Sequence, residues 1–288
     1  MRGLRARSPL ALASPFLVGL AVLVLVPMVA TGVLAFTRFT GTQPPVANGV
    51  DNFARMATDA PLRQSLANTG VHILLAVPLR LAAAFVLAVV LHRRGRGYNA
   101  GRAVAFLPSV VPDVALALLW LWLLNPYYGP VAHVLYGLGL PAPSWLTDPW
   151  SARVAVAVMG GLQVGEAFLV ALAWRRSIPD SLYEMAAVDG ARPAFVLRRV
   201  TLPLMAPVLG LLALRDVVLS LQASFGPSLL VTGGGPRKAT TYLPMYVYDQ
   251  AFRYFRLGYA AAIATALLVA TGAVVAAQYL VARRWRLL

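Results

Sequence analysis

Cysteine is absent from this chain of 288 residues, and lysine and histidine are scarce. Without cysteine there is no disulfide, no thiol nucleophile and no thiolate metal site. The three histidines, His72, His92 and His133, show no metal-ligand spacing, so the sequence predicts no bound metal. No Ser–His–Asp set and no carboxylate pair at catalytic spacing stands out either. We therefore expect a protein that is not an enzyme.

Charged residues are also few, at 12%, whereas hydrophobic residues make up 59% of the chain. The apolar residues form runs of about 20, long enough to cross a hydrocarbon core of roughly 30 Å as helices. In a soluble protein the net charge of +15 would suggest a nucleic-acid partner. Here the basic residues cluster in short loops beside apolar runs, the arrangement that sets membrane topology. The composition predicts an all-α, polytopic membrane protein that does not bind nucleic acid.

Six transmembrane helices are expected, in a single transmembrane domain with both termini in the cytoplasm. The expected spans are residues 15–36, 66–91, 103–124, 152–174, 204–230 and 258–281. The first run exceeds the apolar core of a cleaved signal peptide, about 7–15 residues, so we expect it to be retained. Fifteen of the 25 basic residues lie in the loops and termini assigned to the cytoplasm. This bias supports the assigned orientation.

The cytoplasmic segment 177–203 is polar and basic, although it lies between two of the most apolar runs. Ser177, Pro179 and Asp180 are typical of a helix start, as cap, first-turn residue and complement to the helix dipole. Gly190 is typical of a helix end, because glycine adopts the left-handed conformation readily. The pattern predicts a short helix that ends at this glycine.

A second short helix is expected to begin at Arg192–Pro193 and to end at Leu202–Pro203, where proline breaks or kinks the chain as it re-enters the membrane. Both helices would lie along the cytoplasmic surface and form a docking element for a soluble partner. An ordinary amphipathic interfacial helix is the alternative reading of the same residues.

The segment resembles the EAA coupling motif of ABC importer permeases. The matching residues are Glu184, Ala186, Ala187, Asp189 and Gly190, with Leu202–Pro203 twelve residues after the glycine. Met185 departs from the family pattern, which usually has alanine directly after the glutamate. The resemblance implies that these residues contact a cytoplasmic ATPase, whose ATP-driven closure opens and closes the transmembrane path.

Further short segments are similar to the carbohydrate-uptake branch, which includes maltose and glycerol-phosphate permeases of the first-subunit kind. They are Asp51–Phe53, Asn68–Thr69, Phe106–Pro108, Asn125–Pro126, Gly139–Pro141, Trp145–Leu146, Thr232–Pro236, Phe252–Phe255 and Gly258–Ala261. The resemblance implies a type I ABC importer fold in a bacterial inner membrane. It also implies three partners: an ATPase dimer, a second permease that completes a heterodimer, and an extracytoplasmic solute-binding protein.

Residues 233–238 look like a phosphate-binding loop, but the pattern GxxxxGK[ST] is absent and the segment is expected outside the cell. A glycine-rich turn is the simpler reading. We therefore expect no cofactor on this chain, with ATP bound by the partner subunit.

Several polar residues lie in or near the expected spans, where ionisable groups are costly unless they pair or face water. These are Arg80, Gln163, Glu166, Arg215, Asp216, Gln222 and Ser224. One interpretation is a structural lock, with Arg80 or Arg215 paired to Glu166 or Asp216. The other is a substrate path, lined by Gln163, Glu166, Arg215, Asp216, Gln222 and Ser224, that binds sugar hydroxyls.

The resulting functional hypothesis is the transmembrane permease subunit of an ATP-driven importer of a sugar or sugar-like solute. An ion-coupled secondary transporter is the alternative, because proline-bearing spans and buried charges are also typical of that class. An integral-membrane enzyme is a third class that no motif favours. The sequence does not distinguish an oligosaccharide from a monosaccharide, a polyol or glycerol phosphate as cargo.

Overall fold

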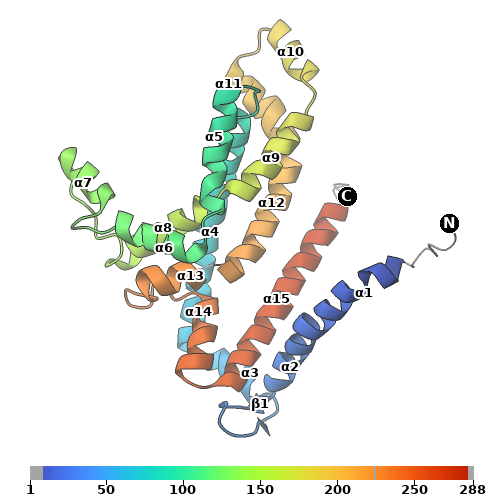
Figure 1. The fold of residues 1–288 in the computed structure, drawn as a ribbon, viewed down its shortest axis with the longest axis vertical. Coiled ribbons are helices and arrows are strands. Elements are labelled where there is room, and N and C mark those ends of the chain that lie inside the picture. The colour runs from blue at the N-terminus through green and yellow to red at the C-terminus, as the bar shows by residue number, and fades with distance from the viewer. Residues whose placement is uncertain (1–8, 224, 285–288) are drawn as a thin grey trace, which may run out of the picture. The chain divides into compact units, whose positions relative to one another are not determined.

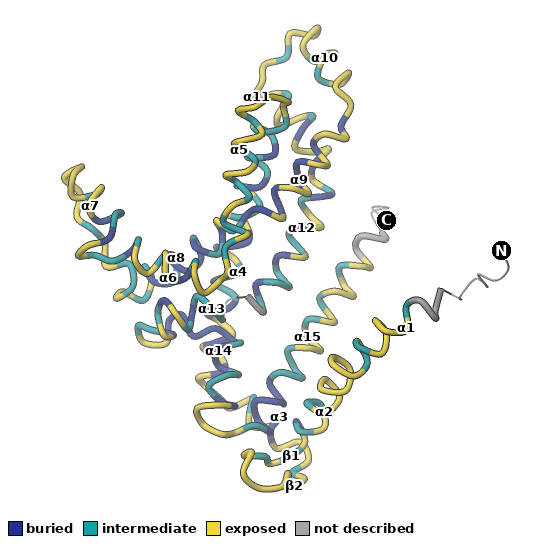
Figure 2. Tube along the Cα trace, in the orientation of Figure 1, coloured by how far each residue is buried: buried dark blue, intermediate teal, exposed yellow. Residues whose placement is uncertain are grey.

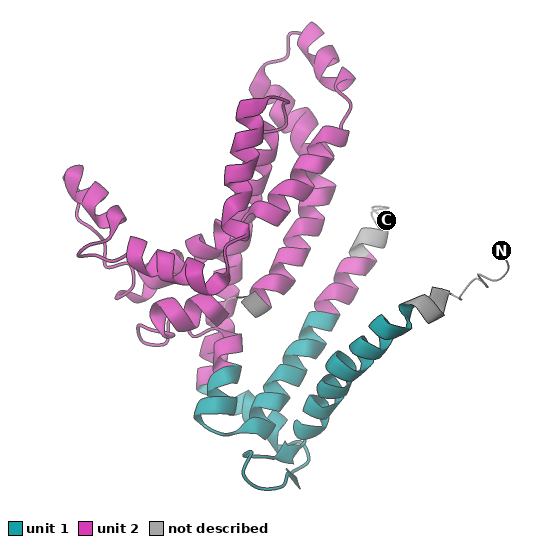
Figure 3. Ribbon diagram, viewed as in Figure 1, with its two compact units in different colours: residues 1–60, 247–272 teal, residues 61–246, 273–288 magenta. Residues whose placement is uncertain are grey.

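The computed structural model describes residues 9–223 and 225–284, and these are mostly helical (Figure 1). The chain forms two compact units, coloured separately in Figure 3. Unit 1 comprises Met1–Ala60 and Val247–Gly272, and unit 2 comprises Pro61–Tyr246 and Ala273–Leu288.

Four helices are long and apolar enough to cross a membrane: Ala13–Leu34, Ala60–Val90, Pro193–Leu221 and Leu257–Leu280. Two further pairs pass the same test only together. They are Arg96–Ser109 with Asp113–Leu123, bent by 98°, and Pro149–Gly161 with Gly165–Ser177, bent by 49°. The described residues thus contain four candidate spans, or up to six if each bent pair is one span.

Unit 1 begins with α1 (Pro9–Leu20), a π-helical turn (Ala21–Leu25) and α2 (Val26–Leu34). None of the most apolar stretch of this run is buried (Figure 2). Phe16 and Leu23 are more than two-thirds exposed. Since such a surface is stable in lipid and not in water, the run suits a membrane-spanning helix.

A small hairpin, β1 (Thr37–Arg38) and β2 (Val46–Ala47), is followed by α3 (Asp51–Thr58). The buried Asn52 amide donates to the carbonyls of Ala35 (2.8 Å) and Thr37 (2.9 Å), which orients α3 against the end of α2. The hydroxyl of Tyr259, in α15 (Leu257–Arg284), donates to Asp59, and the Arg55 guanidinium lies over the Tyr259 ring. Polar contacts therefore tie three parts of unit 1 together.

Gly258 allows the closest of these approaches. Its N–H donates to the Phe39 carbonyl, and a Cβ added there would lie 2.0 Å from the Thr37 carbonyl oxygen. We expect Gly258→Ala to destabilise the protein by about 1–3 kcal/mol, the usual cost of overpacking. Gly272→Ala, in the same helix with open space around it, is the matched control. Folded protein recovered from membranes measures the effect, and equal recovery of both variants would contradict this account.

Unit 2 begins with α4 (Ala60–Val90), α5 (Arg96–Phe106), a 3-10 turn (Leu107–Ser109), α6 (Asp113–Leu123) and α7 (Pro130–Gly137). The expected third span, 103–124, is not one continuous helix. Pro112 has an extended backbone (ψ 140°), so the chain turns between Ser109 and Asp113 and α6 leaves at a steep angle. Proline at that position cannot supply the N–H that a continuous helix needs.

The expected fourth span, 152–174, is also interrupted. It forms α8 (Pro149–Gly161) and α9 (Gly165–Ser177). The Gly165 N–H donates to the Ser109 hydroxyl (2.9 Å), and a Cβ on Gly165 would lie 2.4 Å from that oxygen. A glycine is needed at this break because α9 begins in contact with the 3-10 turn.

Asp148 caps the start of α8, accepting from the N–H groups of Ser151 (2.9 Å) and Trp150 (3.1 Å). The backbone and hydroxyl hydrogen bonds from Ser151, followed by that from Trp150, lower the pKa of Asp148 below its usual value.

The remaining elements are α10 (Ser181–Val188), α11 (Pro193–Val196), a π-helical turn (Leu197–Thr201), α12 (Leu202–Ala223), α13 (Phe225–Pro227), a second π turn (Ser228–Thr232), α14 (Leu243–Tyr248), a third π turn (Asp249–Arg253) and α15. The expected fifth span, 204–230, starts too late, since the apolar helix runs from Pro193 to Leu221. The glycine-rich residues 233–238 form turns, as expected, with Gly233 left-handed (φ +58°).

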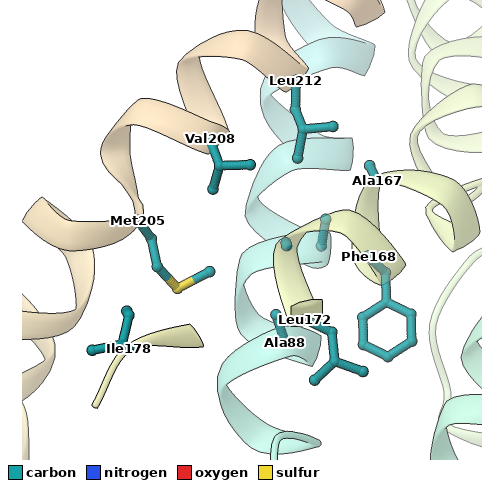
Figure 4. Close-up of a cluster of buried hydrophobic side chains, with 10 residues drawn as sticks. Ala88, Ala167, Phe168, Leu172, Ile178, Met205, Val208 and Leu212 are labelled. Carbon is teal, nitrogen blue, oxygen red and sulfur yellow. The ribbon is translucent and has the colours of Figure 1, made fainter. Parts of the chain in front are cut away.

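The core of unit 2 lies between α4, α9 and α12 (Figure 4). Met205, Val208 and Leu212 project from one side of α12, at helical spacing, toward the other two helices. Alanines on α4 and α9, including the fully buried Ala84 and Ala171, let the helices approach closely. This core connects the end of α9 with the start of α12, the two helices that carry the α10–α11 segment between them.

Candidate functional site

The segment between α9 and α12 begins differently from the sequence expectation. Ser177 is the last residue of α9, and its hydroxyl donates to the Trp174 carbonyl (2.7 Å) and does not cap the next helix. Ile178, before Pro179, is extended as residues before proline usually are, so α10 starts only at Ser181. The prediction that Ser177 caps this helix is wrong.

The end of α10 is as expected at Gly190, which is left-handed (φ +69°). The Ala191 N–H donates to the Ala186 carbonyl (2.9 Å), and the Gly190 N–H donates to the Ala187 carbonyl (3.1 Å). These two bonds form a Schellman motif, which satisfies carbonyls that a helix end leaves free. The turn after α10 is therefore fixed by backbone hydrogen bonds.

The second helix starts with Pro193 at its first position, as expected, but it does not end at Leu202–Pro203. One helix continues from Pro193 to Leu221. The Leu202 N–H donates to the Leu197 carbonyl across a π turn, and this wider turn accommodates Pro203 without a break. The expected surface helix is therefore the N-terminal part of a candidate span.

An apolar groove of about 620 Å³ lies beside the α10–α11 turn. It is lined by Leu182, Met185, Ala186, Asp189, Ala191, Arg192, Phe195 and Val200. Val188 and Met185, on the outer surface of α10, are 88% and 64% exposed. Glu184, Ala187 and Asp189 are exposed as well. A short helix with such a surface fits a partner that covers it.

Tyr183 joins α10 to the neighbouring helices. The Arg175 guanidinium lies 4.1 Å above its ring, and its hydroxyl is 3.3 Å from that of Thr201. Ile178 enters the core of α9 and α12, and Tyr183 packs against it. A displacement of α10 would therefore be transmitted to α9 and α12 through side chains that are already in contact.

Four charged residues of the candidate spans meet in unit 2. Arg80 donates to the Gly160 carbonyl and lies 3.6 Å from the buried Asp216 carboxylate, which is also 3.7 Å from Arg215. Arg215 in turn pairs with Glu166. The Asp216 end of this network is buried, whereas the side chains of Glu166 and Arg215 are 66% and 44% exposed.

Gln163 donates to Asp113 (3.4 Å) beside a small hollow that Trp120 and Met159 help to line. Asp113 was missed as a candidate, although a carboxylate inside the expected third span is itself a signal. Gln222 lies in α12, and Ser224 lies outside the described residues. Of the predicted path residues, Glu166, Arg215 and Asp216 thus meet in one network, whereas Gln163 contacts Asp113.

The family model for binding-protein-dependent transport system inner membrane components matches residues 80–287. That match covers well over half of the chain, including α10 and the charged network. The chain belongs to this family.

Curated relatives are similar in sequence to this chain over most of their own length. A probable ABC transporter permease, YesP of Bacillus subtilis, is 31% identical over 94% of this chain and 89% of its own. The sn-glycerol-3-phosphate permease UgpA of Agrobacterium fabrum is 31% identical over 80% of this chain and 79% of its own. The trehalose/maltose permease MalF of Thermococcus litoralis is 30% identical over 85% and 82%.

A solved bacterial ABC transporter, involved in import of the acidic polysaccharide alginate, has a chain with the same fold. Its TM-score is 0.82 at 24% identity, and the match covers 95% of this chain and 94% of that one. The resemblance to ABC importer permeases is therefore confirmed. Members of this family are transport subunits, so neither the secondary-transporter nor the enzyme alternative is favoured.

Proposed function

We propose that this chain is the transmembrane subunit of an ATP-driven importer for a sugar or sugar-like solute, working with a second, homologous permease. Membership of the binding-protein-dependent family supports the transport role. The names of its relatives, trehalose/maltose and sn-glycerol-3-phosphate permeases, support the substrate class. An external solute-binding protein would deliver the cargo, and the exposed Tyr127, Tyr128 and Trp150 offer it an aromatic surface.

The proposed topology has six spans, with each bent pair counted as one, and both termini in the cytoplasm of a bacterial inner membrane. The bias of arginine toward the loops on the α10 side supports it. In this topology the α10–α11 turn lies in the cytoplasm.

The observation that carries the proposal is α10 itself: a helix capped at its C-terminal end, with an exposed apolar surface beside a groove, on a chain whose sequence has no nucleotide-binding motif. A separate ATPase dimer would bind ATP and cover this surface. We assign the contact to Glu184, Ala186, Ala187, Asp189 and Gly190. Leu202 and Pro203 lie past the π turn and would support it from α12.

Closure of the ATPase dimer would move α10 as a lever. Tyr183, stacked under Arg175 and close to Thr201, would carry the motion to α9 and α12. Because those helices also carry Glu166 and Arg215, the motion would reach the charged network. The exposed Glu166–Arg215 pair, together with Gln163 and Asp113, would line a water-filled path and bind solute hydroxyls. Arg80 and the buried Asp216 would hold their helices together.

A charge on the docking surface tests the proposal. Val188 is 88% exposed and lies in α10, so Val188→Arg should leave the fold of the chain intact. We expect it to remove the ATPase from the purified complex and to abolish uptake, because a buried unpaired charge at an interface is strongly unfavourable. Val134→Arg, on the exposed surface of α7, is the control.

Two outcomes would contradict the proposal. One is normal ATPase recovery and uptake with Val188→Arg. The other is solute uptake that continues on an ion gradient after ATP is depleted, which would favour a secondary transporter.

A further inference from the structure

A second pocket of unit 2, polar and separate from the α10–α11 groove, lies where α4 and α9 end. It has a volume of about 380 Å³ and is lined by His92, Arg93, Arg94, Arg175, Arg176 and Asp180. Four arginines and one aspartate line the pocket, so its side chains carry a net charge of +3 when His92 is neutral. Partial burial, opposed by a hydrogen bond to the Val89 carbonyl, lowers the pKa of His92 and favours that neutral form.

Arg175 is the most unusual member of this pocket. It is only 5% exposed, its Nε lacks a hydrogen-bond partner, and within the described residues it has no carboxylate within ion-pair distance. The Tyr183 ring covers one side of its guanidinium. A buried cation normally has a hydrogen-bonded anion beside it, so the described part of the chain leaves a place for an anion here.

Hydrogen bonds hold the backbone of the loop that lines the pocket. Arg176 donates to the His92 carbonyl (3.3 Å), and Arg102 donates to the carbonyls of Leu91 and Arg93. The Arg176 bond holds the loop after α4 against the end of α9, and the Arg102 bonds hold the same loop against α5. The side chains of Arg93 and Arg94 are left exposed beside Arg175. The loop that lines the pocket is therefore held by hydrogen bonds from both α9 and α5.

The position of the pocket indicates the source of the anion. It lies at the end of α4, a candidate span, and directly after Trp174 of α9. Trp174 is 41% exposed and donates from its indole N–H to the Leu204 carbonyl (2.9 Å), an arrangement typical of the membrane interface. Cations at the end of a span lie at the depth of lipid headgroups, and basic pockets between transmembrane helices bind such headgroups.

We propose that this pocket binds the phosphate of an anionic glycerophospholipid in the leaflet on the α10 side of the membrane. The phosphodiester accepts from Arg175 and Arg176, with Arg93 and Arg94 closing over it. A zwitterionic lipid carries the same phosphate but adds a cation that the net positive pocket repels. A bound lipid at this place would support the start of the segment that carries α10.

The test uses the full chain, purified with the subunits that accompany it, and native mass spectrometry to count bound lipids. We expect phosphatidylglycerol to bind in preference to phosphatidylcholine. Arg94→Gln should weaken phosphatidylglycerol binding about fivefold, the value of one basic residue near an anionic surface. Arg96→Gln removes an exposed arginine at the start of α5 that does not line the pocket, and it should leave binding unchanged. Arg176→Gln, measured in the same way, tests the side of the pocket that α9 provides.

Three results would overturn the proposal. Equal weakening by Arg96→Gln and Arg94→Gln would indicate diffuse attraction without a site. Inorganic phosphate that binds where phosphatidylglycerol does not would assign the pocket to a free anion. Loss of the ATPase subunit from Arg94→Gln, with lipid binding unchanged, would assign it to an acidic surface of that partner. Lipid counts do not depend on transport, so failure of the proposed function leaves this readout intact.

Discussion

Replacing Gly190 with valine is expected to lower ATP-driven uptake by about tenfold or more, whereas asparagine at the same position should be tolerated. Gly190 is left-handed (φ +69°), and a left-handed backbone costs an ordinary L-residue roughly 1–2 kcal/mol. Branching at Cβ makes valine poorer still, whereas asparagine adopts this conformation more readily. The space around Gly190 is open, so the side chains themselves meet no obstacle. Within this chain, the two variants therefore differ in how well each residue adopts the left-handed backbone.

Uptake and the ATPase rate should be measured together for both variants, with recovery of the assembled complex as the control for folding. If the turn positions α10 on the ATPase, valine uncouples hydrolysis from uptake or loosens the ATPase. Gly210→Ala, at an open position in α12, should change neither quantity. Equal uptake by the valine and asparagine variants would mean that the Schellman motif has no part in coupling.

Local sequence rules predicted this turn because its cause is local. Asp189–Gly190 favours a helix end and Arg192–Pro193 favours a helix start, and both features are present in the structure. The same rules misplaced the start of α10, since Ser177 is equally suited to the end of α9. Whether a helix continues through such a residue depends on packing, and here the core that includes Leu172, Ile178 and Met205 keeps α9 helical to its last turn.

The effect of each proline was harder to predict. Pro203 is expected to break or kink the chain, and a π turn lets the helix continue there without a break. Pro112 lies inside an expected span, but there the chain bends by 98°. Proline removes one N–H in both cases, and the outcome depends on neighbouring groups that sequence spacing does not reveal. Pairing in the charged network was likewise open, because Arg80 and Asp216 are 136 positions apart.

Asp216 is the residue of this network whose loss should cost most stability. Its side chain is 1% exposed and lies between two guanidinium groups, Arg80 at 3.6 Å and Arg215 at 3.7 Å. Removing one partner of a buried pair leaves an uncompensated charge, which typically costs about 3–5 kcal/mol. We expect Asp216→Ala to lower the free energy of unfolding by about that amount, measured by thermal unfolding of the purified complex in detergent.

Glu166→Ala is the matched control because it removes a carboxylate from the same network at its open end. The Glu166 and Arg215 side chains are 66% and 44% exposed, and exposed pairs contribute at most about 1 kcal/mol. We therefore expect this variant to unfold nearly as the parent does, and to show its defect in uptake if Glu166 lines the solute path. Equal destabilisation by the two variants would mean that the companion permease buries Glu166 in the assembled importer. The network would then act as a lock at both ends, and the solute path would lie elsewhere.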